Sequence, residues 1–241
     1  MNKAYMTHFV CWYPSIEESR KIYKILSLYS EYIEIQFPFS DPLADWPTIY
    51  TANFQALKNW ITTSDCFKFI ENIGIPKDIK LIIMTYYQIA SHYWMKDFLQ
   101  LAQSLWVYGI IIPDIPFDSI EWREMIKYCL EYNICFIPVV APNCSDERLW
   151  SICSIPSKLI YVMSSSSTTG TNNIDIVKLS QYIQKIRKKC KWKKIAVWFW
   201  VQTVEERKKV LEIADIVVMG SVLINKYKKW WSTLLKKFLS E

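Results

Sequence analysis

Two carboxylates near the N-terminal end of the chain are the side chains best placed for acid–base chemistry. Glu34 lies inside the apolar run Tyr32-Ile-Glu-Ile-Gln-Phe-Pro38, where an unpaired carboxylate is costly to ionise. No lysine or arginine occurs within the apolar run of another predicted strand, so no cationic partner for Glu34 is evident. We therefore interpret Glu34 as a functional carboxylate that burial keeps protonatable.

The run is followed by the loop Phe39-Ser-Asp-Pro-Leu-Ala-Asp-Trp-Pro-Thr48, which contains Asp41 and Asp45. Proline residues restrict the backbone of this loop, so Asp45 can be held over the end of the Glu34 strand at a small entropic cost. A buried acid beside a solvated carboxylate suits general acid–base catalysis. The simpler role of turn former and helix cap fits Asp41 better than Asp45.

Two later segments have the composition of phosphate-binding loops. Gly220-Ser221 ends the buried run Val217-Val-Met, and Ser164-Ser-Ser-Ser-Thr-Thr-Gly170 follows another predicted strand. Backbone N–H groups at a helix N-terminus bind phosphate after the last strands of many (β/α)8 barrels. A plain helix cap explains Gly220-Ser221 as well.

Other catalytic arrangements do not fit the sequence. His8 and His92 have no cysteine or histidine partners at metal-ligand spacing. Neither histidine fits into a Ser-His-Asp catalytic triad. Lys80, Lys158 and Lys194 fall at or just before the starts of predicted strands, whereas a Schiff-base lysine of a barrel lies at the C-terminal end of a strand. Carbon–carbon cleavage by this chain would therefore be acid–base chemistry without a metal.

The elements that must position these residues alternate along the whole chain. The predicted strands are His8–Cys11, Tyr32–Phe37, Lys80–Tyr86, Gly109–Pro113, Ile134–Val140, Leu159–Met163, Lys194–Val197 and Asp215–Met219. Amphipathic helical segments lie between them, among them Ser15–Leu28, Thr51–Leu57, Tyr93–Leu105, Ser119–Tyr132, Ile174–Cys190 and Val204–Ile213. Eight βα units favour a closed parallel barrel, so we predict a single (β/α)8 TIM-barrel domain over residues 1–241.

Composition agrees with a globular chain, because 51% of its residues are hydrophobic and 22% are charged. Its apolar runs are shorter than a membrane span and no signal-peptide pattern is present, so we expect a cytoplasmic protein. The net charge of +6 is concentrated in Lys185–Lys194 and Lys226–Lys237, which we interpret as solvated helix faces rather than a nucleic-acid or membrane site. The seven cysteines are expected to be reduced thiols.

The segment from Glu34 to Thr48 resembles the signature of tryptophan synthase α subunits, a Glu-bearing strand followed by Pro-Phe-Ser-Asp-Pro-x-Ala-Asp-Gly-Pro-Thr. Further matches follow in the family's order over nearly the whole chain: Thr85–Tyr87, Ile112–Pro116, Tyr161, Thr169-Gly170, the Phe199 segment and Gly220-Ser221. The resemblance implies a lyase subunit that splits indole-3-glycerol phosphate into indole and glyceraldehyde 3-phosphate. An isomerase-type phosphate barrel would share Gly220-Ser221 but not the loop.

The resemblance also implies roles for individual residues. Glu34 would move protons to indole C3 and from the glycerol hydroxyl, Asp45 would interact with the indole N–H, and Tyr161 matches an active-site tyrosine. The positions that match substrate- or phosphate-binding residues are Tyr86, Gly170, Phe199, Trp200, Gly220 and Ser221.

A β subunit that carries pyridoxal phosphate (PLP) is the partner that the resemblance implies, in an α2β2 complex that passes indole through a tunnel. Asp41-Pro42 resembles part of that contact, and no cofactor is expected in this chain. Two features depart from the family. Only Met1–Thr7 precede the first predicted strand where most members have a helix, and Ser164–Gly170 lacks the usual arginine and second glycine.

Glycine is scarce and tryptophan is abundant in this chain. The sequence has 4 glycines and 12 tryptophans, where about 7% glycine, or roughly 17 residues, is typical. Seven tryptophans stand where the family's motifs have glycine: Trp12, Trp46, Trp60, Trp94, Trp106, Trp198 and Trp200. We hypothesise that UGA codons for glycine were translated as tryptophan. The alternative is a catalytically impaired barrel that acts only as an allosteric partner of the β subunit.

Overall fold

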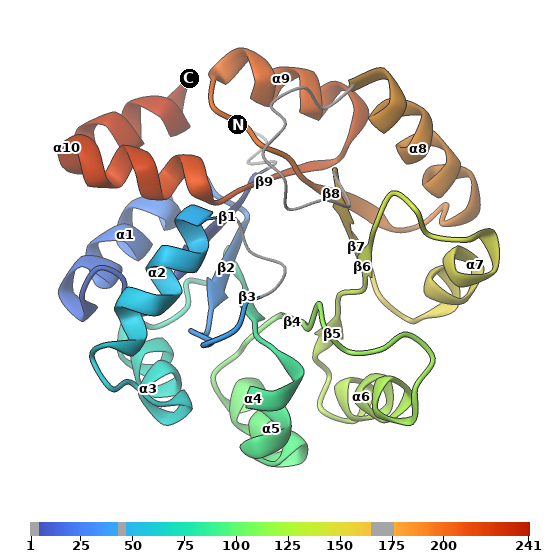
Figure 1. The fold of residues 1–241 in the computed structure, drawn as a ribbon, viewed down its shortest axis with the longest axis horizontal. Coiled ribbons are helices and arrows are strands. Elements are labelled where there is room, and N and C mark those ends of the chain that lie inside the picture. The colour runs from blue at the N-terminus through green and yellow to red at the C-terminus, as the bar shows by residue number, and fades with distance from the viewer. Residues whose placement is uncertain (1–4, 43–46, 165–175) are drawn as a thin grey trace.

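The computed structural model describes residues 5–42, 47–164 and 176–241, which form one barrel of parallel strands enclosed by helices (Figure 1). The sheet order is β5-β4-β3-β2-β1-β9-β8-β7-β6, and every pair is parallel. The strands are β1 (Tyr5–Val10), β2 (Tyr32–Gln36), β3 (Lys80–Met84), β4 (Gly109–Ile111), β5 (Cys135–Phe136), β6 (Val139–Val140), β7 (Leu159–Met163), β8 (Lys194–Trp198) and β9 (Ile216–Met219).

The predicted strand Ile134–Val140 forms two short strands, β5 and β6, which stand at the two ends of that order. Pro138 lies between them and has no N–H for the ladder. The Ile137 N–H donates to the Ile110 carbonyl at 2.9 Å, and the Pro138 carbonyl accepts from the Tyr161 N–H at 3.0 Å. One segment thus pairs with β4 on one side and β7 on the other, which closes the eight-stranded barrel that the sequence predicts.

Helices cover the outside of this barrel, and Figure 1 shows α10 beside α1 where the ring of helices meets. Ser15, Ser119 and Ser145 cap three helices, and Thr62 and Thr203 start two others with capping boxes. The helices are α1 (Ile16–Tyr29), α2 (Pro47–Leu57), α3 (Thr63–Ile73), α4 (Tyr87–His92), α5 (Met95–Ser104), α6 (Ile120–Glu131), α7 (Asp146–Ser154), α8 (Ile176–Lys189), α9 (Val204–Ile213) and α10 (Ser221–Ser240).

Alternation along the strands separates two apolar layers. In β1, Met6 packs inside the barrel with Tyr32, Ile82 and Ile216, whereas Phe9 belongs to the layer between the strands and the helices. Inward-facing side chains therefore fill the barrel, and a polar side chain at an inward position needs a partner there.

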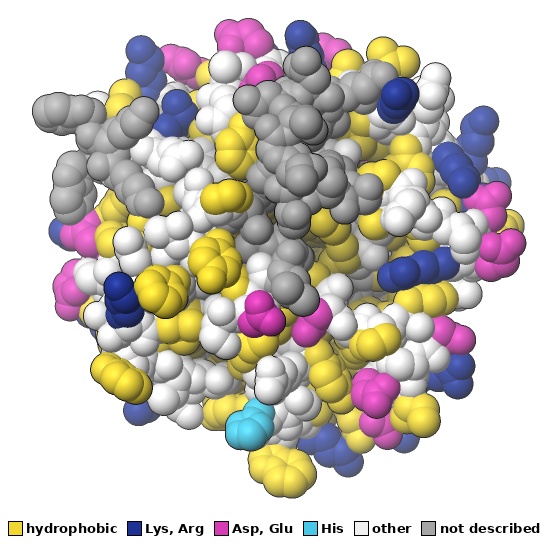
Figure 2. Space-filling view, viewed as in Figure 1, with side chains coloured by type: hydrophobic (Ala, Val, Ile, Leu, Met, Phe, Trp, Pro, Cys, Tyr) yellow, Lys and Arg dark blue, Asp and Glu magenta, His cyan; other side chains and the backbone are white. Residues whose placement is uncertain are grey.

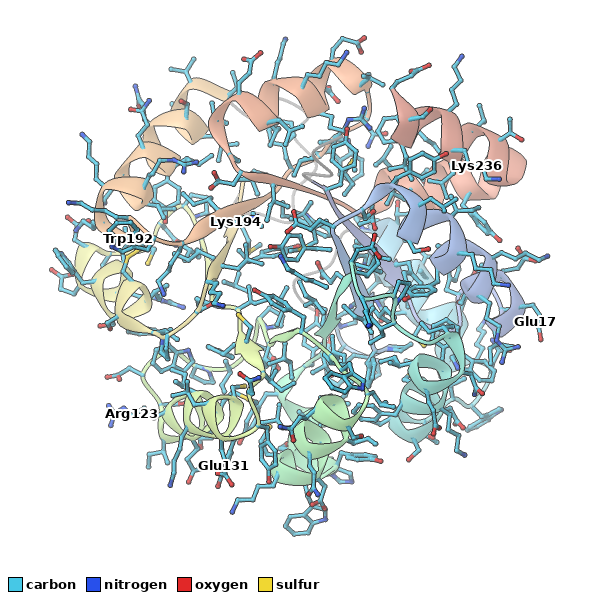
Figure 3. The ribbon with its side chains drawn as sticks, turned by 180° about the vertical axis from the view of Figure 1, so that it is seen from behind. Glu17, Arg123, Glu131, Trp192, Lys194 and Lys236 are labelled. Atoms are coloured by element: carbon cyan, nitrogen blue, oxygen red, sulfur yellow. A yellow bond between two sulfur atoms is a disulfide. The ribbon has the colours of Figure 1, made fainter. Side chains whose placement is uncertain are left out.

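The N-terminal end of the barrel is occupied by a charged and aromatic cluster, which we call the basal cluster: Glu31, Tyr32, Lys80, Tyr108 and Lys194. Glu31 accepts hydrogen bonds from Lys80 at 2.7 Å and from Lys194 at 3.4 Å. The Lys80 ammonium also lies 4.8 Å from the ring centre of Tyr32 and 5.7 Å from that of Tyr108. Seen from behind, Figure 3 shows Lys194 nearer the middle of the molecule than the labelled helix residues. No described helix precedes β1.

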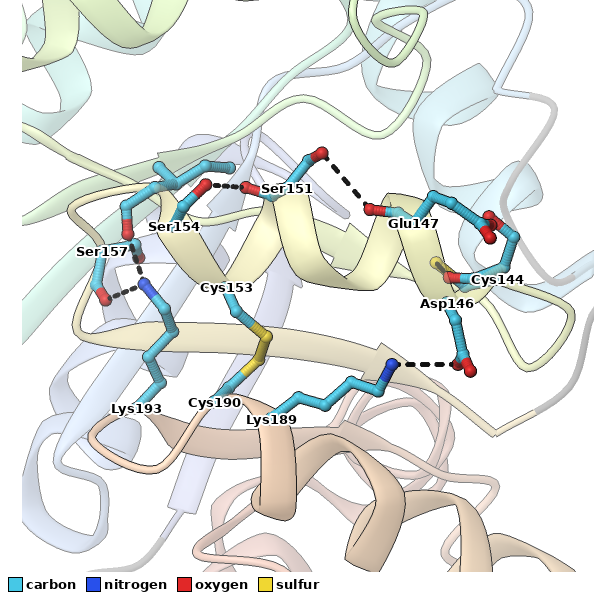
Figure 4. The surroundings of a disulfide bond; sticks show 12 residues. Cys144, Asp146, Glu147, Ser151, Cys153, Ser154, Ser157, Lys189, Cys190 and Lys193 are labelled. Carbon is cyan, nitrogen blue, oxygen red and sulfur yellow. Dashed lines mark hydrogen bonds and ion pairs between the residues drawn. A yellow bond between two sulfur atoms is a disulfide. The ribbon is translucent and has the colours of Figure 1, made fainter.

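Two cysteines correct the expectation of seven reduced thiols. Cys153 of α7 and Cys190, next to the end of α8, form a disulfide with their Cα atoms 5.0 Å apart (Figure 4). The two residues are 37 positions apart, and neighbouring helices of the barrel bring them together. Sequence spacing alone could not reveal this pairing. The other five cysteines are free.

Basic side chains are spread around the outside of the molecule. In Figure 2 the Lys and Arg side chains lie at separate points around the rim of the visible face. Several pair with carboxylates, such as Lys185 and Lys189 with Asp146 at 2.7 and 3.2 Å. This distribution agrees with solvated helix faces. Within the described ranges, no helix is long and apolar enough to cross a membrane.

Candidate active site

A small cavity lies inside the barrel at the C-terminal ends of the strands, and Glu34 and Tyr161 both line it. It measures about 40 Å³ and is bordered by His8, Glu34, Met84, Ile111, Pro113, Val139, Tyr161, Met163 and Trp198. These residues come from seven strands, all except β5 and β9, and from the loop after β4. The structure thus brings two of the predicted catalytic residues to one place, at the end of the barrel where active sites of this fold occur.

Glu34 has a partner that the sequence did not suggest. It is 1% exposed, and its Oε1 lies 3.0 Å from Nδ1 of His8, which is also 1% exposed. The two residues are opposite each other in the β1–β2 ladder. The partner of Glu34 is therefore a histidine rather than a lysine or arginine.

His8 was missed for a definite reason. The predicted strand began at His8, which made this residue a strand end, but β1 begins at Tyr5 and His8 is an inward residue in its middle. In the parallel register of β1 and β2, Met6 lies opposite Tyr32, and His8 therefore lies opposite Glu34. The signal was present in the sequence, but it required the correct strand start.

Tyr161 and Tyr86 occupy different surroundings. Tyr161 lies in β7 at the cavity, with its ring centre 6.0 Å from that of Trp198. Tyr86 follows β3, is 1% exposed, and stacks on Phe39 with ring centres 4.6 Å apart. Tyr86 does not border the 40 Å³ cavity, although it belongs to the same apolar cluster inside the barrel. A direct substrate contact by Tyr86 thus stays a prediction.

The predicted phosphate-binding residues after the last strand lie at a helix N-terminus. Gly220 precedes α10, which begins at Ser221 and runs for 20 residues. The Ser221 hydroxyl is buried and has no hydrogen-bond partner in the described part of the chain. A β-carbon at Gly220 would lie 2.8 Å from Cη2 of Trp198 and 3.2 Å from Cδ2 of His8, so any side chain there would crowd these rings. A buried hydroxyl without a partner among the described residues thus lies at a helix N-terminus, a position where anions commonly bind.

Phe199 and Trp200 follow β8 directly and are half-buried. Phe199 packs against the outer apolar layer. In the loop after β2, Asp41 is exposed and Pro42 is buried. Asp45 and Gly170, the remaining predicted site residues, lie outside the described residues. Among the residues that the structure describes, no group of three or more histidines, cysteines and acids could hold a metal ion.

Four of the seven tryptophans at the family's glycine positions have a left-handed backbone. The φ angles are +64° at Trp12, +54° at Trp60, +64° at Trp94 and +61° at Trp106, a conformation that glycine adopts freely and that large side chains rarely adopt. The only other described non-glycine residues with positive φ are Asp118 and Asn133, which are types that tolerate it.

Trp198 has a different effect, because its ring occupies the mouth of the barrel. The ring centre lies 5.4 Å from that of His8, and the ring also borders the cavity and contacts the Gly220 position. A cavity of about 40 Å³ holds one or two water molecules rather than an indole-sized ligand. The Trp198 side chain thus narrows the space beside Glu34.

Fold and site together define a (β/α)8 barrel whose C-terminal mouth combines a buried carboxylate with the N-terminus of α10. The family model "Tryptophan synthase alpha chain" matches residues 1–237. The tryptophan synthase alpha chain of Petrotoga mobilis is 34% identical over 226 residues, which are 92% of this chain and 86% of that one. The chain therefore belongs to the tryptophan synthase alpha chain family.

Solved structures agree with this membership. The tryptophan synthase A-subunit of Pyrococcus furiosus has a TM-score of 0.88 at 26% identity, over 99% of this chain and 97% of that one. A tryptophan synthase complex from Pyrococcus furiosus contains a chain with a TM-score of 0.87 at 26% identity, again over 99% and 97%.

Proposed function

We propose that this chain is a lyase subunit that cleaves indole-3-glycerol phosphate to indole and glyceraldehyde 3-phosphate in tryptophan biosynthesis. The observation that carries the proposal is the buried Glu34 carboxylate, which shares a cavity with Tyr161 at the C-terminal end of the barrel. Family membership supplies the substrate. The activity belongs to the EC 4.2.1.20 complex.

Acid–base chemistry by protein side chains is sufficient for this cleavage. In the proposed reaction Glu34 removes the proton of the glycerol hydroxyl and delivers a proton to indole C3. Protonated C3 makes the ring accept the electron pair of the breaking carbon–carbon bond, which leaves indole and an aldehyde. Asp45 would hold the indole N–H, and Tyr161 would border the bound ring. No cofactor in this chain takes part in these steps.

The substrate phosphate would bind where α10 begins. The Ser221 hydroxyl is a buried group without a partner among the described residues, and Gly220 lets a ligand approach the backbone. Phe199, Trp200 and Gly170 would complete this subsite by analogy with the family, and Tyr86 would border the substrate on the β3 side.

A β subunit that carries PLP would receive the indole, in an α2β2 complex. The relative from Pyrococcus furiosus was solved as a complex, which supports a partner subunit. Asp41 and Pro42 lie directly after the catalytic strand, so a partner that binds there would lie close to Glu34.

We propose that the cell incorporates glycine at the seven tryptophan positions. Three observations support it: the match to family glycines, the left-handed backbone at Trp12, Trp60, Trp94 and Trp106, and the ring of Trp198 in the mouth. Reading UGA as glycine accounts for all three. If the cell does place tryptophan at position 198, the narrowed mouth favours the alternative function, in which a catalytically impaired barrel only regulates a β subunit.

Two measurements test the coding proposal. The gene should carry UGA at the seven positions, and tandem mass spectrometry of the protein from its own cells should find glycine in the peptides that contain residues 60, 94 and 106. UGG codons with tryptophan in those peptides would disprove it.

The function is tested on the chain with all seven tryptophans changed to glycine, hereafter the glycine form. We expect it to release indole and glyceraldehyde 3-phosphate in equal amounts from indole-3-glycerol phosphate, and faster with a β subunit present. Indoleglycerol without the phosphate is the matched control and should react far more slowly. A folded glycine form that releases no indole, with or without the β subunit, would disprove the lyase function.

A further inference from the structure

The buried pair of His8 and Glu34 is only half satisfied. Its one hydrogen bond joins Nδ1 to Oε1 at 3.0 Å. The outer atoms, Nε2 of His8 and Oε2 of Glu34, are buried and have no hydrogen-bond partner in the described ranges. Buried polar atoms without partners are costly, so they are retained mainly where a ligand or a reaction uses them.

Rigid surroundings hold the imidazole in place. Its backbone lies in the β1–β2 ladder opposite Glu34, with further pairs on both sides of it. The Trp198 ring meets the imidazole edge-on at 88°, and Cδ2 of His8 lies close to Gly220, where an added β-carbon would be 3.2 Å from it. The pairing itself is fixed by β1 and β2 alone, so it does not depend on which residue occupies position 198.

We propose that His8 is a positioning residue for Glu34, an inference that rests on the proposed lyase function. In this arrangement the Nδ1–H of His8 donates to Oε1 of the Glu34 carboxylate. That bond occupies one carboxylate oxygen and fixes the plane of the group. Oε2 is then the single oxygen that takes the proton from the glycerol hydroxyl and returns one to indole C3. The geometry assigns no proton transfer to His8 itself.

Kinetics of three variants of the glycine form provide the first test. His8→Phe keeps a ring but removes the donor, so we expect kcat to fall about 10- to 100-fold and KM to change less than about twofold, because the phosphate subsite is untouched. His8→Asn keeps an N–H close to the position of Nδ1 and should recover most of kcat. His92→Gln is the matched control, since His92 is the only other histidine and is exposed on α4.

The result would separate the two proposals. If Glu34→Gln abolishes activity but His8→Phe leaves kcat unchanged, the positioning role of His8 is wrong and the lyase site stands. If Glu34→Gln leaves activity intact, the proposed function of Glu34 is wrong as well. A parallel loss in His8→Phe and His8→Asn, with unchanged folding by thermal unfolding, would contradict the role of the Nδ1 donor.

A second measurement does not depend on activity. With two histidines in the chain, nitrogen-15 NMR of histidine-labelled protein gives two ring systems, and His92→Gln assigns them by elimination. We expect a proton on Nδ1 of His8 at neutral pH, and a change in the Nδ1 shift on Glu34→Gln. A bare Nδ1 in the parent protein would overturn the proposal.

Discussion

The two ends of the barrel use a glutamate in opposite ways. Glu31, just before β2, lies in the basal cluster and binds two lysines, whereas Glu34, three residues later, faces one histidine and keeps an unpaired oxygen. The basal carboxylate is partly solvated, and its Oε1 is paired with two lysines, which favours the charged form. The carboxylate at the mouth is 1% exposed, and its Oε2 has no hydrogen-bond partner among the described residues. We therefore expect Glu31, at the N-terminal end of the barrel, to contribute to stability, and Glu34, at the C-terminal end, to carry the chemistry.

Exchanging each glutamate for glutamine tests this division most strongly. In the glycine form, Glu34→Gln should lower kcat for indole release by about 10²- to 10⁴-fold, the usual contribution of a general acid–base group. Glu31→Gln is the matched control, because the same change at the other end of β2 should leave kcat within about twofold. Steady-state kinetics of the two variants measure the effect. Equal losses would contradict the assignment of chemistry to the mouth alone.

Opening the mouth should restore ligand binding. Trp198→Gly together with Trp200→Gly removes the ring that borders the cavity beside Glu34 and the ring at the neighbouring family glycine position. We expect the affinity for indole-3-glycerol phosphate to rise about tenfold or more over the printed sequence, since overpacking by a large ring opposes binding. Calorimetric titration in a Glu34→Gln background avoids turnover. Affinity that does not change would show that Trp198 does not block the site.

The exposed left-handed tryptophans should destabilise the fold without affecting the site. Trp60, Trp94 and Trp106 are 91%, 76% and 85% exposed, so changing each to glycine removes strain and little packing. Each change should raise the free energy of unfolding by about 0.5–1 kcal/mol.

Trp150→Gly provides the control for this prediction. Trp150 is also exposed, at 61%, but it lies within α7 and is absent from the positive-φ residues. Glycine there should lower the free energy of unfolding by about 1 kcal/mol. Urea unfolding gives the free energy of unfolding of all four variants. If Trp150→Gly also stabilised the fold, the left-handed backbone would not explain the effect of the other three changes.

The smallest effect is expected at the basal cluster. Partial burial opposes the charge of Glu31, but the hydrogen bonds and charges of Lys80 and Lys194 outweigh it and lower the pKa of this carboxyl. A lowered folded-state pKa gives stability that is present above the ordinary glutamate pKa and is lost as pH falls through the folded pKa. Solvent screens this half-buried group, so Glu31→Gln should cost less than about 1 kcal/mol at neutral pH.

Thermal unfolding of Glu31→Gln and its parent against pH checks the sign. The difference in Tm should be largest near neutral pH and should disappear in acid, where Glu31 is protonated in the parent. A difference that grows as pH falls would contradict the pairing of Glu31 with the two lysines.

Periodicity was enough to predict the strands of the barrel, because each buried strand is a short apolar run with polar ends. It was not enough for two features that depend on neighbours in space. The His8–Glu34 pair requires the register of β1 against β2, and Cys153–Cys190 requires two helices to end side by side. Likewise the break at Pro138 becomes evident only when β5 and β6 pair with different strands.

Some residues of the candidate site could also be identified from the sequence, whereas others depend on neighbours in space. Glu34 could be identified because a carboxylate inside an apolar strand is unusual, and Gly220-Ser221 because it ends a buried strand. Tyr86 could not be placed at the cavity from its motif, since its stacking on Phe39 depends on the loop after β2. The tryptophans were recognised from the family's glycines, and their backbone angles gave an independent physical reason.

The measurement that tests the central claim most directly is indole release by the printed sequence and by the glycine form, side by side, at equal concentrations and with the same β subunit. We expect both forms to fold, and we expect only the glycine form to release indole at a rate that Glu34→Gln abolishes. Equal activity of the two forms would show that the Trp198 ring does not block the mouth, and would contradict the account.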